Sequence, residues 1–294
     1  MKIIGITGNS GSGKSTISKL ISKNYEAKII DADKIAKEMA KNNGEYLQAI
    51  RQAFGNDVIK NNELDRKKLA DIVFLNRAEK EKLDGLTFEY VVEEIKKELE
   101  EKNIKIEIFK ADVSKREEAS KLVDYAIEKY KKIDVLINNA GISQERLFTD
   151  INDEEWNEII DVNLNSVYYC TKAVIPYMIQ RKSGCIINIS SIWGVTGGSC
   201  EVGYSTSKAA IIGFSKALAK EMGPSNIRIN CIAPGIIDTD MNKNLNENDI
   251  ESIKEEIPLN RIGVSTDIAK CAKWLIEDNY TTGQVINING GWYI

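Results

Sequence analysis

The chain has 294 residues, of which 43% are hydrophobic and 29% are charged. This composition is typical of a globular protein, and the length allows two modest domains or one large α/β domain. A net charge of −4 argues against a general nucleic-acid-binding or anionic-membrane surface. The absence of histidine excludes a Ser-His-Asp triad and any His-ligated zinc site.

The five cysteines form no C-x-x-C pair and all lie beyond residue 169. We interpret them as reduced thiols, as expected in a cytosolic protein. The first residues carry an apolar run too short for a signal-peptide core, and no apolar stretch approaches the roughly 18–20 residues of a membrane span. We therefore expect a cytoplasmic protein with no membrane or nucleic-acid partner.

Near the N-terminus, an Ile-rich strand is expected at Lys2–Thr7, followed by a glycine-rich turn and a helix that begins at Lys14. A second strand is expected at Ala27–Asp31 and ends in Asp31-Ala32-Asp33. The turn reads G-x-x-x-x-G-K-S, with Gly8, Gly11, Ser12, Gly13, Lys14 and Ser15, and Thr16 follows it. This pattern between a strand and a helix predicts a loop whose backbone N–H groups hold nucleotide phosphates. Lys14 would reach the terminal phosphates and Ser15 would bind Mg²⁺. The alternative is a glycine turn without a ligand.

Residues 1–97 resemble dephospho-CoA kinase, on the strength of Ile4–Ser15, Ile30–Asp33, Leu64–Arg66 and Ile72–Phe74. The resemblance implies ATP with Mg²⁺ at the glycine-rich turn, a role in coenzyme A biosynthesis, and Asp33 on the acceptor side as a candidate base. Asp33 is also suited to cap a following helix. The chain departs from the family where Thr-His-Pro is expected, because Phe88 and Glu89 follow Thr87, and the arginine-bearing lid is missing.

Beyond a helical pattern from Lys34 to Lys102, with breaks near Asn42–Gly44 and Gly55–Asp57, strand and helix patterns alternate to the end of the chain. Strands are expected at Ile104–Phe109, Ile133–Ile137, Cys185–Ile189, Arg228–Ile232 and Val285–Ile288. Such alternation predicts a parallel sheet with helices on both faces. The fold class is therefore α/β, a doubly wound, Rossmann-like parallel sheet, with the strand Lys2–Thr7 beside Ile133–Ile137.

A further group of motifs follows these strands in order. They are Asp112-Val113, Asn138-Asn139-Ala140-Gly141, Asn163, Ser191, Tyr204-x-x-x-Lys208 and Pro234-Gly235. A ketone that accepts a hydride needs a proton donor at its oxygen, and Tyr204 can supply one. Lys208 lies one helical turn away, so its charge is expected to lower the tyrosine pKa.

With these motifs, residues 98–294 resemble a short-chain dehydrogenase/reductase of the 3-oxoacyl-carrier-protein reductase kind, an oxidoreductase of fatty acid biosynthesis. The resemblance implies a catalytic set of Asn163, Ser191, Tyr204 and Lys208, in which Ser191 binds the substrate oxygen and Asn163 holds a relay water. It also implies NAD(P)H bound by Asp112, Val113, Asn139, Ala140, Gly141, Pro234 and Gly235. The expected partners are a small-molecule or acyl-carrier substrate and further copies of the chain. Asn163 and Asp112 could instead be caps.

The reductase-like part lacks its own first strand and glycine-rich cofactor loop, and the kinase-like part lacks its lid. We interpret the chain as a hybrid with domains 1–97 and 98–294. Three hypotheses follow: an NAD(P)-dependent reductase that uses the kinase-type loop, an ATP-binding kinase-type protein, and an inactive fusion. The first is favoured because all four reductase catalytic residues are present.

The glycine-rich turn generates the first testable prediction. Because Lys14 is placed for a terminal phosphate, the loop should bind ATP more tightly than NAD(P)H, and Lys14→Ala should weaken ATP binding strongly. Isothermal titration of both proteins with ATP, NADH and NADPH measures this. Equal ATP affinity in the two proteins would mean that the loop is only structural.

Overall fold

The computed structural model describes residues 39–41, 44–60, 63–73, 76–100, 109–242 and 246–294. These residues belong to two compact units, one formed by residues up to 100 and the other by residues from Phe109 onward. The expected strands Lys2–Thr7 and Ala27–Asp31 lie outside the described residues, as does Ile104–Phe109 up to Ile108. The pairing of Lys2–Thr7 with the rest of the sheet therefore stays a prediction.

The smaller unit is helical, with α3 at Gly44–Phe54, α4 at Arg66–Val73 and α5 at Arg77–Glu100. The predicted break near Gly55 is present, because Gly55 has φ +95° and ends α3. A short antiparallel hairpin, β1 (Ile59–Lys60) and β2 (Glu63–Leu64), interrupts the helical pattern and was not predicted. The unit has its own core, which comprises Met39, Ala40, Tyr46, Ile50, Val58, Leu69, Val73 and Val91.

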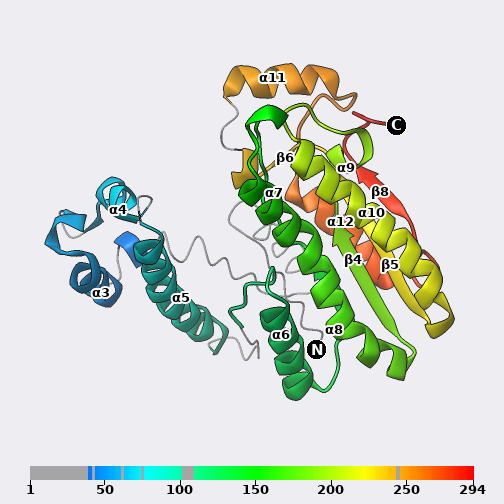
Figure 1. Cartoon of the computed structure of the whole chain (residues 1–294), viewed down its shortest axis with the longest axis horizontal. Helices are drawn as coiled ribbons and strands as arrows, with labels where there is room; N and C mark the ends of the chain where they lie inside the picture. Colours follow the sequence, from blue (N-terminus) through cyan, green and yellow to red (C-terminus); the bar gives the residue numbers. More distant parts are fainter. Residues whose placement is uncertain (1–38, 42–43, 61–62, 74–75, 101–108, 243–245) are drawn as a thin grey trace. The chain divides into compact units, whose positions relative to one another are not determined.

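Among the described residues, the larger unit contains a four-stranded parallel sheet in the order β3-β4-β5-β8. Strands β4, β5 and β8 are labelled in Figure 1. The strands are β3 (Val135–Asn138), β4 (Gly184–Ile189), β5 (Ile227–Pro234) and β8 (Val285–Ile288). The predicted parallel α/β sheet is thus confirmed, with β8 at the predicted residues and the other strands within two residues of prediction at their starts and ends. Strands β4 and β5 are mostly apolar because both of their faces are buried, and Asn188, Arg228 and Asn230 are their polar residues.

Helices cover both faces of the sheet. On one face, α6 (Arg116–Tyr130), α8 (Ser166–Arg181) and α10 (Val202–Met222) pack against a core that includes Ile186 of β4. On the other face, α12 (Ser265–Glu277) packs against Ile187, the next residue of the same strand. Successive side chains of a strand point to opposite faces, so one apolar run serves both layers.

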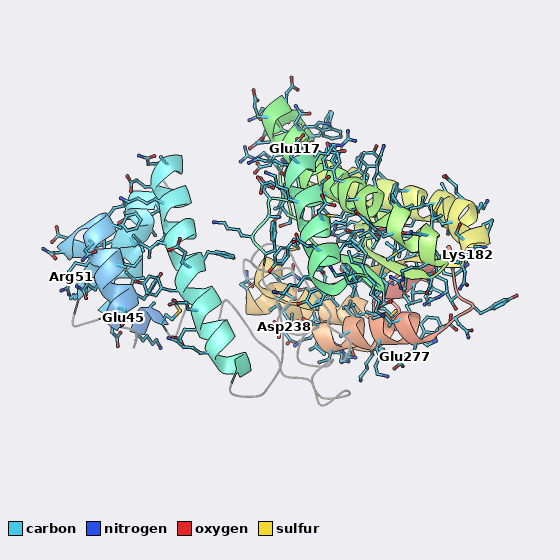
Figure 2. The ribbon with its side chains drawn as sticks, turned by 90° about the horizontal axis from the view of Figure 1, so that it is seen from below. Glu45, Arg51, Glu117, Lys182, Asp238 and Glu277 are labelled. Atoms are coloured by element: carbon cyan, nitrogen blue, oxygen red, sulfur yellow. The ribbon has the colours of Figure 1, made fainter. Side chains whose placement is uncertain are left out.

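Shorter elements complete the unit. They are α7 (Asp153–Ile160), a π-helical turn (Asp161–Asn165), α9 (Trp193–Thr196), β6 (Ile237–Asp238), α11 (Glu247–Glu256) and β7 (Gly263–Val264). Figure 2 shows Lys182, two residues before β4, well separated from Asp238 of β6, which follows β5. Lys182 marks the amino ends of the parallel strands and Asp238 marks their carboxyl ends. Among the described helices, none is both long and apolar enough to cross a membrane.

A chain of buried polar side chains crosses the sheet. Asn138 at the end of β3 donates to Oδ1 of Asn188 on β4 at 2.7 Å and to the hydroxyl of Thr171 on α8 at 3.1 Å. Asn188 donates in turn to Ser215 on α10 at 2.7 Å, and the thiol of Cys231 on β5 lies 3.0 Å from the same hydroxyl. Buried amides are tolerated when they are paired in this way.

The burial of β4 on both faces of the sheet generates a stability prediction. Ile187 is fully buried, so Ile187→Ala should lower the free energy of unfolding by about 2–5 kcal/mol. Ile179→Ala on α8, where the side chain is 40% exposed, is the matched control and should cost much less. Urea denaturation followed by circular dichroism measures both. Equal losses in the two variants would contradict the described core.

Candidate active site

The candidate site lies at the carboxyl ends of the parallel strands, where open α/β sheets usually bind ligands. Residues that follow β3, β4 and β5 meet there around a pocket that opens to solvent. The pocket is lined by Asn139, Gly141, Ile189, Ser190, Ser191, Tyr204, Lys208, Pro234, Gly235, Ile237, Thr239, Met241, Asn242, Ser265 and Ile268. Seven of the predicted catalytic and cofactor-binding residues therefore line a single pocket.

Lys208 is fixed between α10 and the end of β4. Its Nζ donates to the carbonyl oxygen of Ile189 at 3.0 Å, and the side chain is only 4% exposed. In return, the hydroxyl of Ser190 donates to the backbone carbonyl of Lys208 at 2.8 Å. Burial lowers the pKa of Lys208 to about 8, because a low-polarity environment disfavours the charged ammonium.

The pKa of Tyr204 differs from the expectation based on sequence. Burial raises the pKa of its phenol to about 12, and the negative charge of Glu201 adds to this, although a hydrogen bond with Ser191 acts in the opposite direction. The predicted lowering by Lys208 is wrong for this structure. The Lys208 Nζ lies 5.6 Å from the centroid of the Tyr204 ring and donates its hydrogen bond to the carbonyl of Ile189. The effect of burial on the Tyr204 pKa is therefore the larger one.

Asn163 lies in the π-helical turn between α7 and α8, with its side chain fully buried. Its Nδ2 donates to the carbonyl of Ile142 at 3.0 Å and to the hydroxyl of Ser207 at 3.0 Å, while its Oδ1 accepts from the N–H of Ile142 at 2.8 Å. Asn163 therefore ties the loop after β3 to α10. Both amide donors are used, and Oδ1 keeps one acceptor position.

Two glycines allow the close packing of this site. A Cβ atom on Gly141 would lie 3.2 Å from Nζ of Lys208 and 3.3 Å from Oδ1 of Asn163. A Cβ on Gly194 would lie 2.7 Å from the backbone carbon of Lys208, a distance that side chains do not show. Gly194 therefore permits the approach of α9 to α10, and Gly141 keeps the surroundings of Lys208 open.

Val113, Asn139 and Ala140 line a second, much smaller cavity. Their neighbour Asp112 is bonded locally, because its carboxylate accepts from the N–H and the hydroxyl of Ser114 at 3.1 and 2.6 Å. Burial acts to raise the pKa of Asp112, but the hydrogen bonds from Ser114 and Lys115 and the charge of Lys115 outweigh it, so the pKa is lowered. Asp112 thus stabilises the turn that precedes α6.

Sequence reasoning missed Thr239, Asn242, Ser265 and Glu201. Thr239 and Asn242 closely follow Pro234-Gly235, and polar residues just after a strand end were an available signal. Ser265 is buried at the start of α12, and its hydroxyl has no partner within the described residues. Glu201 is half-buried, and burial together with the charge of Glu145 raises its pKa to about 7.

The predicted phosphate-binding and kinase residues lie outside the described residues. They are Gly8, Gly11, Ser12, Gly13, Lys14, Ser15, Thr16 and Asp33. Within residues 39–100 and 109–294, apart from the short gaps given above, no cluster of Cys, Asp and Glu is suited to hold a metal ion.

Comparison with known proteins gives two family matches. The family model described as short chain dehydrogenase matches residues 86–250, and the model described as dephospho-CoA kinase matches residues 2–144. The predicted hybrid character is confirmed, since both family models match this chain, and the two matches overlap between residues 86 and 144.

Curated relatives match the later part of the chain. The 3-oxoacyl-(acyl-carrier-protein) reductase of Chlamydia trachomatis is 49% identical over 182 residues, which are 61% of this chain and 73% of that protein. The protein of the same name from Thermotoga maritima is 39% identical over 217 residues, which are 73% of this chain and 85% of that protein. Nodulation protein G of Rhizobium meliloti is 38% identical over 189 residues, which are 64% of this chain and 77% of that protein.

The buried Lys208 makes stability depend on pH. Its pKa is about 8 in the folded protein against 10.5 ordinarily, so the unfolded chain binds the proton more tightly between these values. Relative to Lys208→Met, the wild type should gain on the order of 2–3 kcal/mol of unfolding free energy as the pH rises from about 8 to about 10.5. Urea denaturation over this pH range measures the difference. The exposed Lys220 on the same helix provides the control, Lys220→Met; a pH-independent difference for Lys208→Met would contradict the burial of a titrating ammonium.

Proposed function

Because the chain belongs to the short-chain dehydrogenase family, we propose that it is an enzyme that reduces a carbonyl group with NAD(P)H. The proposed substrate class is a 3-oxoacyl group on an acyl carrier, the class in the names of its reductase relatives. The observation that carries this proposal is that Ser191, Tyr204 and Lys208 line a single pocket. A carbonyl oxygen placed there would meet a hydroxyl, a phenol and an ammonium.

The protonation states suit reduction. With a pKa of about 12, Tyr204 keeps its proton at neutral pH, and the protonated phenol is the form that donates to an oxygen on which negative charge develops. Ser191, bonded to Tyr204, would hold the same oxygen. Lys208, with a pKa of about 8, can exchange a proton near neutral pH and so help to restore the phenol.

The residues around the pocket fit a dinucleotide. Gly141 leaves open the space beside Lys208, and Gly235 lies so close to Asn289 that a Cβ would come within 2.9 Å of its Cβ. Asn139, Ala140, Gly141, Pro234 and Gly235 would hold the nicotinamide end, and Val113 with Asp112 the adenine end. NAD(P)H supplies the hydride; the chain supplies its position and the proton.

We assign the reductase to residues 98–294 and the kinase-like segment to residues 1–97, whose loop at Gly8–Thr16 would take the cofactor phosphates. A second candidate function is ATP binding with Mg²⁺ at this loop, which the kinase match over residues 2–144 favours. The third hypothesis, an inactive fusion, is decided by the assay below. A homo-oligomeric state and a cytoplasmic location stay predictions.

The central test of the proposed function is turnover. The protein should reduce a 3-oxoacyl thioester or a small activated ketone weakly, because a borrowed phosphate loop misplaces the nicotinamide and errors near 1 Å cost about a hundredfold. Tyr204→Phe should lower this rate by a further factor of about 100 or more, since it removes the proton donor. Cofactor oxidation followed at its absorbance band measures both. The exposed Tyr168 provides the control, Tyr168→Phe, and equal rates in wild type and Tyr204→Phe would place the activity elsewhere.

The same assay tests cofactor choice. Asp31 and Asp33, which lie outside the described residues, end the predicted second strand, where a carboxylate accepts a ribose hydroxyl and repels a 2′-phosphate. We therefore expect a higher kcat/KM with NADH than with NADPH. A clear preference for NADPH would show that the role given to these two residues is wrong.

A further inference from the structure

Beside the candidate site, two tryptophans from distant parts of the chain are in contact. Trp193 begins α9, directly after Ser191-Ile192, and Trp292 lies in the C-terminal tail. Their ring centroids are 5.3 Å apart at an interplanar angle of 62°. Edge-to-face pairs of this kind are stabilising and directional, so each ring restricts the orientation of the other.

Trp193 also contacts one of the predicted catalytic residues, Ser191, and the neighbouring Glu201. Its backbone N–H donates to the hydroxyl oxygen of Ser191 at 3.2 Å. Its indole donates to the carboxylate of Glu201, and the charge of Glu201 acts on Tyr204 one helical turn further along. The position of Trp193 therefore affects the orientation of the Ser191 hydroxyl and, through Glu201, the electrostatic environment of the Tyr204 phenol. These are the two groups that would meet the substrate oxygen.

The C-terminal tail that carries Trp292 is held by specific bonds. The Asn289 carbonyl accepts from the N–H of Trp292 at 3.2 Å, and the Gly290 carbonyl accepts from the N–H of Leu259 at 3.2 Å. The indole of Trp292 donates to Glu256 at the end of α11 at 3.1 Å. Gly290 and Gly291 have φ of +68° and +89°, which glycine adopts without strain.

We propose that Trp292 is a positioning residue, which acts through Trp193 to hold Ser191 and Glu201 in place beside Tyr204. The proposal rests on the proposed reductase function for its effect on turnover. Neither tryptophan lines the pocket, so the effect is transmitted through Ser191 and Glu201.

The charged groups around Glu201 give this arrangement a pH signature. Glu145, on the loop after β3, lies close enough to repel the Glu201 carboxylate, because the N–H of the next residue, Arg146, bonds to the carbonyl of Cys200 at 2.6 Å. The guanidinium of Arg146 is paired with Glu155 of α7 at 3.2 Å. Burial and Glu145 raise the pKa of Glu201 to about 7, and the Trp193 indole opposes them. Displacement of Trp193 should therefore raise this pKa further.

The first measurement does not depend on activity. Indole fluorescence of the wild type should change with a midpoint near pH 7 as Glu201 titrates beside Trp193, and the change should be absent in Glu201→Gln. Trp292→Ala should move the midpoint to higher pH, whereas Trp292→Phe, which keeps an aromatic ring, should leave it near the wild-type value. A Trp292→Ala curve that superimposes on the wild-type curve would overturn the proposal.

The second measurement is turnover. Trp292→Ala should lower kcat by about tenfold, the cost of a displacement of roughly half an ångström, with the KM for the cofactor unchanged. Trp292→Phe should stay within about twofold of wild type, as should the control Trp274→Ala, which removes an exposed tryptophan on α12. Equal kcat in wild type and Trp292→Ala would overturn the positioning role. The wild type could bind cofactor without turnover while Trp292→Ala still shifts the fluorescence midpoint. That pair of results would contradict the proposed function and support the coupling of Trp292 to Glu201.

Discussion

The candidate site depends on the burial of one ammonium group. Lys208 lies inside the larger unit with its Nζ bonded to the last carbonyl of β4, while Ser190 bonds to the backbone of Lys208 itself. A buried charge is costly unless it is paired, so this reciprocal attachment fixes α10 against the end of the sheet. Tyr204, one turn earlier on α10, is thereby brought to Ser191. Gly194 is required because the backbone of Lys208 lies too close to accept a side chain, and a Cβ at Gly141 would press on Lys208 and Asn163.

Much of the larger unit could be predicted from its sequence. Mostly apolar runs such as that of β4 are typical of parallel strands buried on both faces, and the polar and glycine residues that follow them mark the strand ends. The hairpin at Ile59–Leu64 was not predictable in this way. Its strands have two residues each, too few for a periodic pattern, and its position depends on packing within the smaller unit.

The sequence predicted which residues form the site better than it predicted their pKa values. The spacing of Tyr204 and Lys208 places them on one helical face, and both line the pocket. The pKa of Tyr204 could not be read from that spacing, since it depends on burial by residues far away in the sequence and on Glu201. The bonds of Asn163 to Ile142 and Ser207 were equally hidden, because a π-helical turn directs the side chain. Thr239 and Ser265 join the pocket only through the packing of β6 and α12.

The buried chain of polar side chains from Asn138 to Cys231 fixes the alignment of the sheet. Asn138, Asn188 and Cys231 lie in register across β3, β4 and β5. A slip of any of these strands by one residue would move it by about 3.3 Å and turn its polar side chain to the opposite face. The amides would then be buried without partners, so misaligned sheets are disfavoured during folding. Because the predicted catalytic and cofactor-binding segments begin just after these strands, a slip small enough to preserve the fold would still misalign those segments. The three side chains therefore fix the relative positions of the residues that follow the strands.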